Sequence, residues 1–187
     1  MSAQALRIGV FGASFNPPHW GHWDAVMQVL AADQVDQVLA IPSYSHALKD
    51  GLMDYDLRLR MTRTLFAEDT AVCVEDLERP LARQLKKDGE PIYTWDVLMY
   101  LRRRNPAVEW VLIIGPDVAH PSTWSRFYRH EQIAQEFAIE VVAQRLQTRS
   151  SLIRGQRNTE GLLPERVQAL YRWAGATRSA ARADSAS

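Results

Sequence analysis

The sequence predicts an α/β fold in a single domain, with a doubly wound parallel sheet. Short apolar runs, such as residues 37–41 and 109–114, alternate with longer segments that repeat apolar residues at helical spacing. Alternating strands and helices favour a parallel sheet with right-handed crossovers. With 187 residues, 47% of them hydrophobic, the chain can build one such domain around a complete core.

The individual elements follow from local residue patterns. The first strand is an apolar run that ends in small residues, and Asp54 is a residue type that commonly begins a helix. Pro106 ends the helix before it, because the residue preceding a proline avoids helical geometry. Strands are expected at residues 6–11, 37–41, 70–74, 109–114 and 137–143, and helices at residues 21–32, 54–67, 93–104, 150–156 and 164–173.

Two segments are expected to lie outside this framework. Residues 76–91 are highly charged and are predicted to form an exposed connection. The chain from Gly175 onward is rich in Ala, Ser and Arg, so the domain is expected to span residues 1–175 and residues 176–187 to form a disordered tail. There is no internal repeat and no sign of a second domain.

Composition excludes several classes of function. Lys plus Arg equals Asp plus Glu at 22 each, so no overall basic charge indicates a nucleic acid partner. The one cysteine, Cys73, cannot form an intrachain disulfide and fits a reducing compartment. The sequence shows neither a signal peptide nor a stretch long enough to span a membrane. We therefore expect a cytoplasmic protein, whose oligomeric state the sequence leaves open.

The stretch that organises the chain runs from residue 10 to residue 22, VFGASFNPPHWGH. After the first strand, Gly12, Ala13 and Ser14 are small enough to let backbone N–H groups approach an anion. A proline pair leads into the next helix, whose N-terminus carries partial positive charge. His19 and His22 are three residues apart, so both rings project to one side of its first turn. This arrangement predicts a phosphate site with two imidazole donors.

Other interpretations of these histidines are weaker. A zinc helix of the HExxH kind needs histidines four residues apart, and no cysteine cluster completes a site here. A small-residue turn alone is common in strand-to-helix connections. Strand, turn, proline pair and HxxH together favour the phosphate site.

GASFNPPHWGH resembles the HxGH signature of the nucleotidylyltransferase superfamily, and further motifs are similar to those of bacterial nicotinate/nicotinamide mononucleotide adenylyltransferases. The motifs cover residues 8–171, nearly the whole chain, and the third and fourth point to the pyridine nucleotide branch. In order they are GASFNPPHWGH, RLRM at 58–61, YTWDVL at 93–98, IIGPD at 113–117 followed by Trp124, and SSLIR at 150–154.

The resemblance implies a Rossmann-like domain that transfers AMP from ATP to nicotinate or nicotinamide mononucleotide and releases pyrophosphate. It implies Mg²⁺ bound mainly through ATP phosphates, because Asn16 stands where the family often has Asp. No metal site on the protein itself is expected. The implied catalytic residues are His19, His22 and Arg154. The implied ATP contacts are Gly12, Ala13, Ser14, Phe15, His19, His22, Gly115, Asp117, Ser150, Ser151 and Arg154. The implied acceptor contacts are Lys49, Tyr93, Thr94 and Trp124.

The residues themselves leave alternatives beside these roles. Asp117 follows a buried strand, where its carboxylate suits ribose hydroxyls or caps the next helix. Trp124 is a candidate platform for a pyridine ring, although a Trp is more often a core residue. Thr94 is either an acceptor contact or an N-cap. Ser150 and Ser151 with Arg154 form either a phosphate site or a cap with a surface Arg.

Three departures from the family pattern affect these expectations. Trp124 is one residue closer to Asp117 than the family pattern has it. The segment before Ser150 is short, so Arg145 and Arg149 are crowded beside the expected site. His46 and Lys49 match the family's phosphate-facing loop only loosely, with Lys49 the better contact. A sister transferase with another phosphorylated acceptor and a non-catalytic nucleotide-binding module remain alternatives, and the preference between the two pyridine nucleotides stays open.

Overall fold

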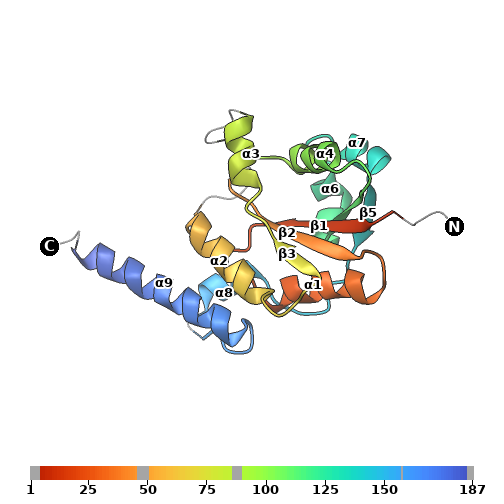
Figure 1. The fold of residues 1–187 in the computed structure, drawn as a ribbon. Coiled ribbons are helices and arrows are strands. Elements are labelled where there is room, and N and C mark those ends of the chain that lie inside the picture. The colour runs from red at the N-terminus through yellow and green to blue at the C-terminus, as the bar shows by residue number, and fades with distance from the viewer. Residues whose placement is uncertain (1–4, 46–50, 86–89, 157, 185–187) are drawn as a thin grey trace.

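Five parallel strands of the described chain form one sheet, in the order β3-β2-β1-β4-β5 (Figure 1). This computed structural model describes residues 5–45, 51–85, 90–156 and 158–184, with only the backbone described for 176–184. The order reverses direction at β1, which pairs with β2 on one side and β4 on the other. The strands are β1 (Arg7–Ala13), β2 (Gln37–Pro42), β3 (Val72–Val74), β4 (Glu109–Ile114) and β5 (Ala138–Val141). The predicted α/β parallel sheet is confirmed.

Helices cover both faces of the sheet (Figure 1). Each face has its own hydrophobic core. Successive side chains of β4 alternate between the two cores: Leu112 belongs to one, and Val111 and Ile113 to the other. A strand buried on both faces reads as a continuous apolar run, and this is why EWVLII was recognisable. The helices are α1 (Trp20–Ala31), α2 (Tyr55–Leu65), α3 (Glu78–Gln84), α4 (Thr94–Arg104), α5 (Pro116–Ala119), α6 (Pro121–Trp124), α7 (His130–Glu136), α8 (Ser150–Gly155) and α9 (Glu165–Asp184).

Helix starts agree with the expected capping chemistry. The Asp54 carboxylate accepts a hydrogen bond from the Leu57 N–H at 3.0 Å, so Asp54 is the N-cap of α2 as predicted. His19 is the N-cap of α1, where its ring nitrogen replaces the usual oxygen acceptor. None of the helices in the described part of the chain is both long and apolar enough to cross a membrane.

The segment predicted as an exposed connection contains a helix, so that prediction was wrong. Within residues 76–91, helix α3 buries Glu78, Leu81 and Ala82. Leu81 and Ala82 pack into the core that α4 shares, while Arg83, the next residue, is exposed. The segment contains so many charged residues that the short amphipathic pattern of α3 was not recognised in the sequence.

The C-terminal segment also differs from its prediction. Helix α9 continues to Asp184, so the backbone from Gly175 to Asp184 is helical where disorder was expected. Ala and Arg are strong helix formers, and one Gly costs a helix only about 1 kcal/mol, so the composition is compatible with either state. Figure 1 shows α9 extending beyond the body of the domain.

Candidate nucleotide site

A cavity of about 540 Å³ opens where β1 and β4 end, on the side where parallel sheets commonly bind ligands. Of the predicted site residues, twelve line it: Gly12, Ala13, Ser14, His19, His22, Tyr93, Thr94, Gly115, Asp117, Ser150, Ser151 and Arg154. Phe15 and Trp124 are not among the lining residues, and Lys49, with His46, lies outside the described residues. The fold thus gathers residues that are up to 142 positions apart in sequence, from Gly12 to Arg154.

The two histidines lie against each other at the start of α1. Their ring centroids are 3.8 Å apart, and the His22 Nδ1 accepts a hydrogen bond from the His19 backbone N–H at 3.1 Å. The His19 Nδ1 accepts from the Gly21 N–H, also at 3.1 Å. Because each Nδ1 is an acceptor, the hydrogen-bond network assigns the proton of each neutral ring to Nε2. Both rings therefore have a donor on the nitrogen that does not bind the backbone.

His19 is buried, with 6% of its surface exposed. Burial lowers the pKa of His19 to about 4, since a charged imidazolium would lose its hydration there. At neutral pH this ring is uncharged, so it can act on an anion as a hydrogen-bond donor and not as a cation. The positive potential at this end of α1 comes from the backbone N–H groups instead.

Helix α8 lies against the loop that connects β1 to α1. The Ser150 hydroxyl donates to the Pro17 carbonyl at 2.9 Å, and the Arg154 Nη1 donates to the Asn16 carbonyl at 2.5 Å. A Cβ on Gly21 would lie 2.7 Å from the Thr148 Oγ1, so only glycine allows this close approach. The SSLIR motif and the HxxH motif are consequently joined by direct contacts.

Gln28 makes a second link between α1 and the segment after β5. Its Nε2 donates to the Ala143 carbonyl at 2.9 Å, and its Oε1 accepts from the Ala143 N–H at 3.0 Å. Arg145 and Arg149, which follow that point, both line the cavity. The short segment before Ser150 therefore supplies two cations to the wall of the site.

Gly115 and Asp117 lie at the start of the short helix α5, immediately after β4. Gly115 is the N-cap and Asp117 is inside the first turn, where its side chain is exposed and lines the cavity. Asp117 is thus not a helix cap in this structure. Tyr93, and not Thr94, is the N-cap of α4, and the Tyr93 N–H donates to the Asp96 carboxylate at 3.2 Å.

Two of the predicted contacts are placed elsewhere by the fold. Phe15 is fully buried, and its ring lies 4.7 Å from that of His22, so its side chain supports the histidine and does not reach a ligand. Trp124 stacks on Phe127 with ring centroids 5.4 Å apart, and its half-buried ring packs against the core. The ring of Tyr128, 4.9 Å from Tyr93, lines the cavity in its place.

Sequence reasoning missed Arg58 and Glu78 as site residues. The guanidinium of Arg58, on α2, is 1% exposed and donates to the Met53, Ser14 and Ser43 carbonyls at 2.9, 2.8 and 2.7 Å. It therefore ties together the two loops that follow β1 and β2. Glu78 is 6% exposed and lines the cavity. The only signal in the sequence was RLRM, which located Arg58 but not its partners.

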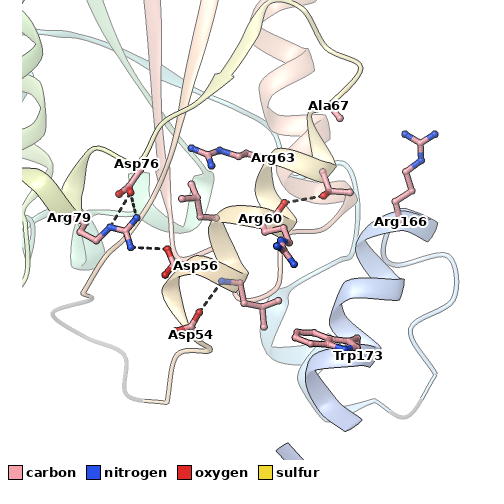
Figure 2. A pocket seen from close by; sticks show the side chains of 12 residues that line it. Asp54, Asp56, Arg60, Arg63, Ala67, Asp76, Arg79, Arg166 and Trp173 are labelled. Carbon is pink, nitrogen blue, oxygen red and sulfur yellow. Dashed lines mark hydrogen bonds and ion pairs between the residues drawn. The ribbon is translucent and has the colours of Figure 1, made fainter. Parts of the chain in front are cut away.

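A wider hollow of about 880 Å³ lies between α2 and α9 (Figure 2). It shares no lining residue with the first cavity. Figure 2 shows that two of its acidic side chains are already paired, because Arg79 donates hydrogen bonds to both Asp56 and Asp76. None of the predicted site residues lies there, so the cavity beside the histidines is the candidate site.

A model of the cytidylyltransferase-like family matches residues 10–156, which contain most of the residues that line the cavity. The chain belongs to the cytidylyltransferase-like family. The match includes strands β2 to β5, the second half of β1, and both phosphate-site motifs, HxxH and SSLIR.

Relatives and solved structures agree with this family. A probable nicotinate-nucleotide adenylyltransferase of Anaeromyxobacter dehalogenans is 30% identical, over 89% of this chain and 97% of that protein. One from Myxococcus xanthus is 31% identical over 70% of this chain, and the match covers 66% of its own length. Another, from Geobacter metallireducens, is matched over half its length. A putative nicotinate-nucleotide adenylyltransferase structure from Vibrio parahaemolyticus has a TM-score of 0.70 at 25% identity, covering 88% of this chain and 91% of that one.

Proposed function

We propose that this chain transfers the AMP moiety of ATP to nicotinate or nicotinamide mononucleotide and releases pyrophosphate. The observation that carries the proposal is the meeting, in one cavity, of His19 and His22 with the start of α8. Relatives named probable nicotinate-nucleotide adenylyltransferases support the choice of acceptor. Because the single cysteine, Cys73, suits a reducing compartment, we place the reaction in the cytoplasm.

The reaction needs no nucleophile from the protein. A phosphate oxygen of the acceptor attacks the α-phosphorus of ATP, and the bond from that phosphorus to the oxygen bridging to the β-phosphate breaks. Pyrophosphate leaves with the electron pair of that bond. The protein's contribution is to hold the two phosphates in line and to stabilise the charge that develops between them.

The stabilising donors come from both sides of the cavity. The His22 and His19 Nε2–H groups and the backbone N–H groups at the start of α1 face one side of the phosphates. Arg154 supplies the charge that the neutral His19 lacks, and Ser151 adds a hydroxyl at the start of α8. Loss of one such preorganised donor typically costs about 10²–10³ in rate.

The remaining contacts divide between the two nucleotides. Gly12, Ala13 and Ser14 lie beneath the phosphates. The Asp117 carboxylate accepts hydrogen bonds from the ribose hydroxyls of ATP, next to Gly115. Tyr93 and Thr94 contact the acceptor, as Lys49 is also expected to do. Tyr128 supplies an aromatic face in the cavity, which is the role first expected of Trp124.

The proposal includes Mg²⁺, held mainly by the phosphates of ATP. In the described residues no group of three or more His, Cys, Asp or Glu side chains is placed to hold a metal ion. The Asn16 Oδ1 accepts from the Met53 N–H at 2.9 Å, so this amide is already used within the protein. Such a site fits an ion that arrives with the nucleotide and keeps several of its waters. When bound, Mg²⁺ supplies neutralisation of phosphate charge.

A sister transferase with a different phosphorylated acceptor is the alternative, and the position of Trp124 outside the cavity favours it. The test is to incubate the protein with ATP, Mg²⁺ and each acceptor, and to measure pyrophosphate and the dinucleotide product. Dinucleotide formed with either pyridine nucleotide supports the proposal. Turnover only with other phosphorylated acceptors supports the sister transferase, and nucleotide binding without turnover supports a non-catalytic module.

A further inference from the structure

Glu78 is a buried acid that faces the cavity and has no role in the chemistry described above. It is 6% exposed, and its Oε2 accepts a hydrogen bond from the Tyr44 N–H at 2.8 Å. Among the described residues, its second oxygen, Oε1, has no hydrogen-bond partner. A carboxyl oxygen at the wall of a cavity is suited to a partner that enters the cavity.

Burial leaves Glu78 largely uncharged at neutral pH, although the groups that face it favour its ionised form. Burial raises the pKa of Glu78 to about 8, and the Tyr44 N–H and the Arg58 guanidinium oppose that rise. Arg58 is engaged with three backbone carbonyls, and the Tyr55 hydroxyl donates to Asp76 at 2.8 Å. Asp76 is in turn paired with Arg79. In its acid form Glu78 can therefore donate a hydrogen bond into the cavity.

The cavity is polarised, and Glu78 lies away from its positive side. Arg126, Arg145, Arg149 and Arg154 all line the cavity from segments that follow β4 or β5. Glu78 follows β3, at the opposite edge of the sheet, and shares its side with Ser43 and Ser45. The arginine side suits a triphosphate. Because the arginines attract the phosphates, the side that holds Glu78 is left for the less charged part of the second nucleotide.

We propose that Glu78 is a specificity-determining residue that contacts the ring substituent of the acceptor nucleotide. This inference rests on the proposed function. The acid form donates a hydrogen bond to the carboxylate of a nicotinate ring. The ionised form repels that carboxylate and accepts a hydrogen bond from the amide of a nicotinamide ring. The preference between the two acceptors consequently depends on the protonation of Glu78.

The experiment measures kcat/KM for both acceptors at saturating ATP and Mg²⁺ between pH 6.5 and 9.5. Three proteins are compared: the wild type, Glu78→Gln, and Glu75→Gln as a matched control at an exposed position outside the cavity. In the wild type and the control, the ratio for nicotinate over nicotinamide falls about tenfold per pH unit above pH 8. In Glu78→Gln the ratio does not change with pH, because an amide does not titrate. Equal pH dependence in wild type and Glu78→Gln overturns the proposal, as does a flat wild-type profile.

A binding measurement on the wild type tests the same point if Glu78→Gln does not fold. At pH 8.5, the protein takes up protons when it binds nicotinate mononucleotide, and it takes up fewer when it binds nicotinamide mononucleotide. Calorimetry in two buffers of different ionisation enthalpy measures this proton uptake. Equal proton uptake for the two ligands overturns the assignment of Glu78. Absence of any pyrophosphate release with either acceptor is a different result, because it refutes the proposed function itself.

Discussion

Replacing Arg58 with Met tests whether one buried cation holds the site together. The Arg58 guanidinium donates to the Met53, Ser14 and Ser43 carbonyls, at 2.9, 2.8 and 2.7 Å. Ser14 belongs to the loop after β1, and Ser43 to the loop after β2, and both residues line the cavity. Methionine fills a similar volume but donates no hydrogen bond, so Arg58→Met leaves three carbonyl oxygens without their donor.

The magnitude follows from these three contacts. Each buried acceptor left without a donor costs about 1–2 kcal/mol, or about 3–6 kcal/mol together. The apolar methionine side chain and the removal of a buried charge offset about 1–2 kcal/mol of that. We therefore expect the free energy of unfolding to fall by about 3 kcal/mol, a large part of the 5–15 kcal/mol typical of a domain.

The measurement is urea denaturation at pH 7, with Arg60→Met as the matched control. Arg60 is exposed, lies half a turn further along α2, and has no ion-pair partner among the described residues. Arg60→Met should change stability by no more than about 0.5 kcal/mol. If Arg58→Met and Arg60→Met give the same unfolding midpoint, the cross-link between the two loops contributes nothing and the reasoning fails.

The remaining predictions concern the cavity itself. His22→Ala should lower kcat by about 10²–10³ with little change in the acceptor KM, measured as pyrophosphate release at saturating ATP; near-normal turnover would remove His22 from catalysis. His19 has a folded pKa of about 4 against an ordinary value of 6.5, so the unfolded chain binds its proton first as pH falls. This contribution to stability is present above pH 6.5 and is lost toward pH 4, by about 3 kcal/mol, and urea titrations of His19→Asn should lack it. Tyr128→Ala should raise the acceptor KM more than Trp124→Ala does, and the reverse order in steady-state kinetics would return the ring contact to Trp124.

The sheet could be predicted from the sequence because its strands are apolar on both faces. Runs such as EWVLII and QVLAI are typical of strands covered on both faces, and their alternation with helices predicted parallel pairing. The phosphate-site histidines could also be predicted from the sequence, since an HxxH motif after a small-residue turn depends only on local geometry. The lowered pKa of His19 could not be predicted, because the burial of this residue depends on contacts with distant segments.

What the sequence did not reveal depends on contacts between distant segments or on the exact length of a loop. Glu78 was hidden in a charged segment, although Leu77 and Leu81, four residues apart, mark the apolar side of α3. Trp124 was assigned from a motif whose spacing here is one residue short, and its half-buried ring packs against the core. Nothing local distinguishes Arg58 from the exposed Arg60 two positions later, because only the tertiary structure brings three carbonyls to it.

The paired hydrogen bonds of Gln28 have a consequence for motion in this domain. The Gln28 side-chain amide makes the same pair of hydrogen bonds to the Ala143 backbone that a residue of an adjacent β-strand would make. Helix α1, although it packs against the face of the sheet, is thereby fastened to the chain leaving the edge strand β5. His22 is on that helix, and Arg154 follows that chain. Any opening of the cavity that separates these two residues must first break the Gln28 pair, so we expect the histidine and the arginine to move as one body while the loops after β2 and β4 adapt to the ligand.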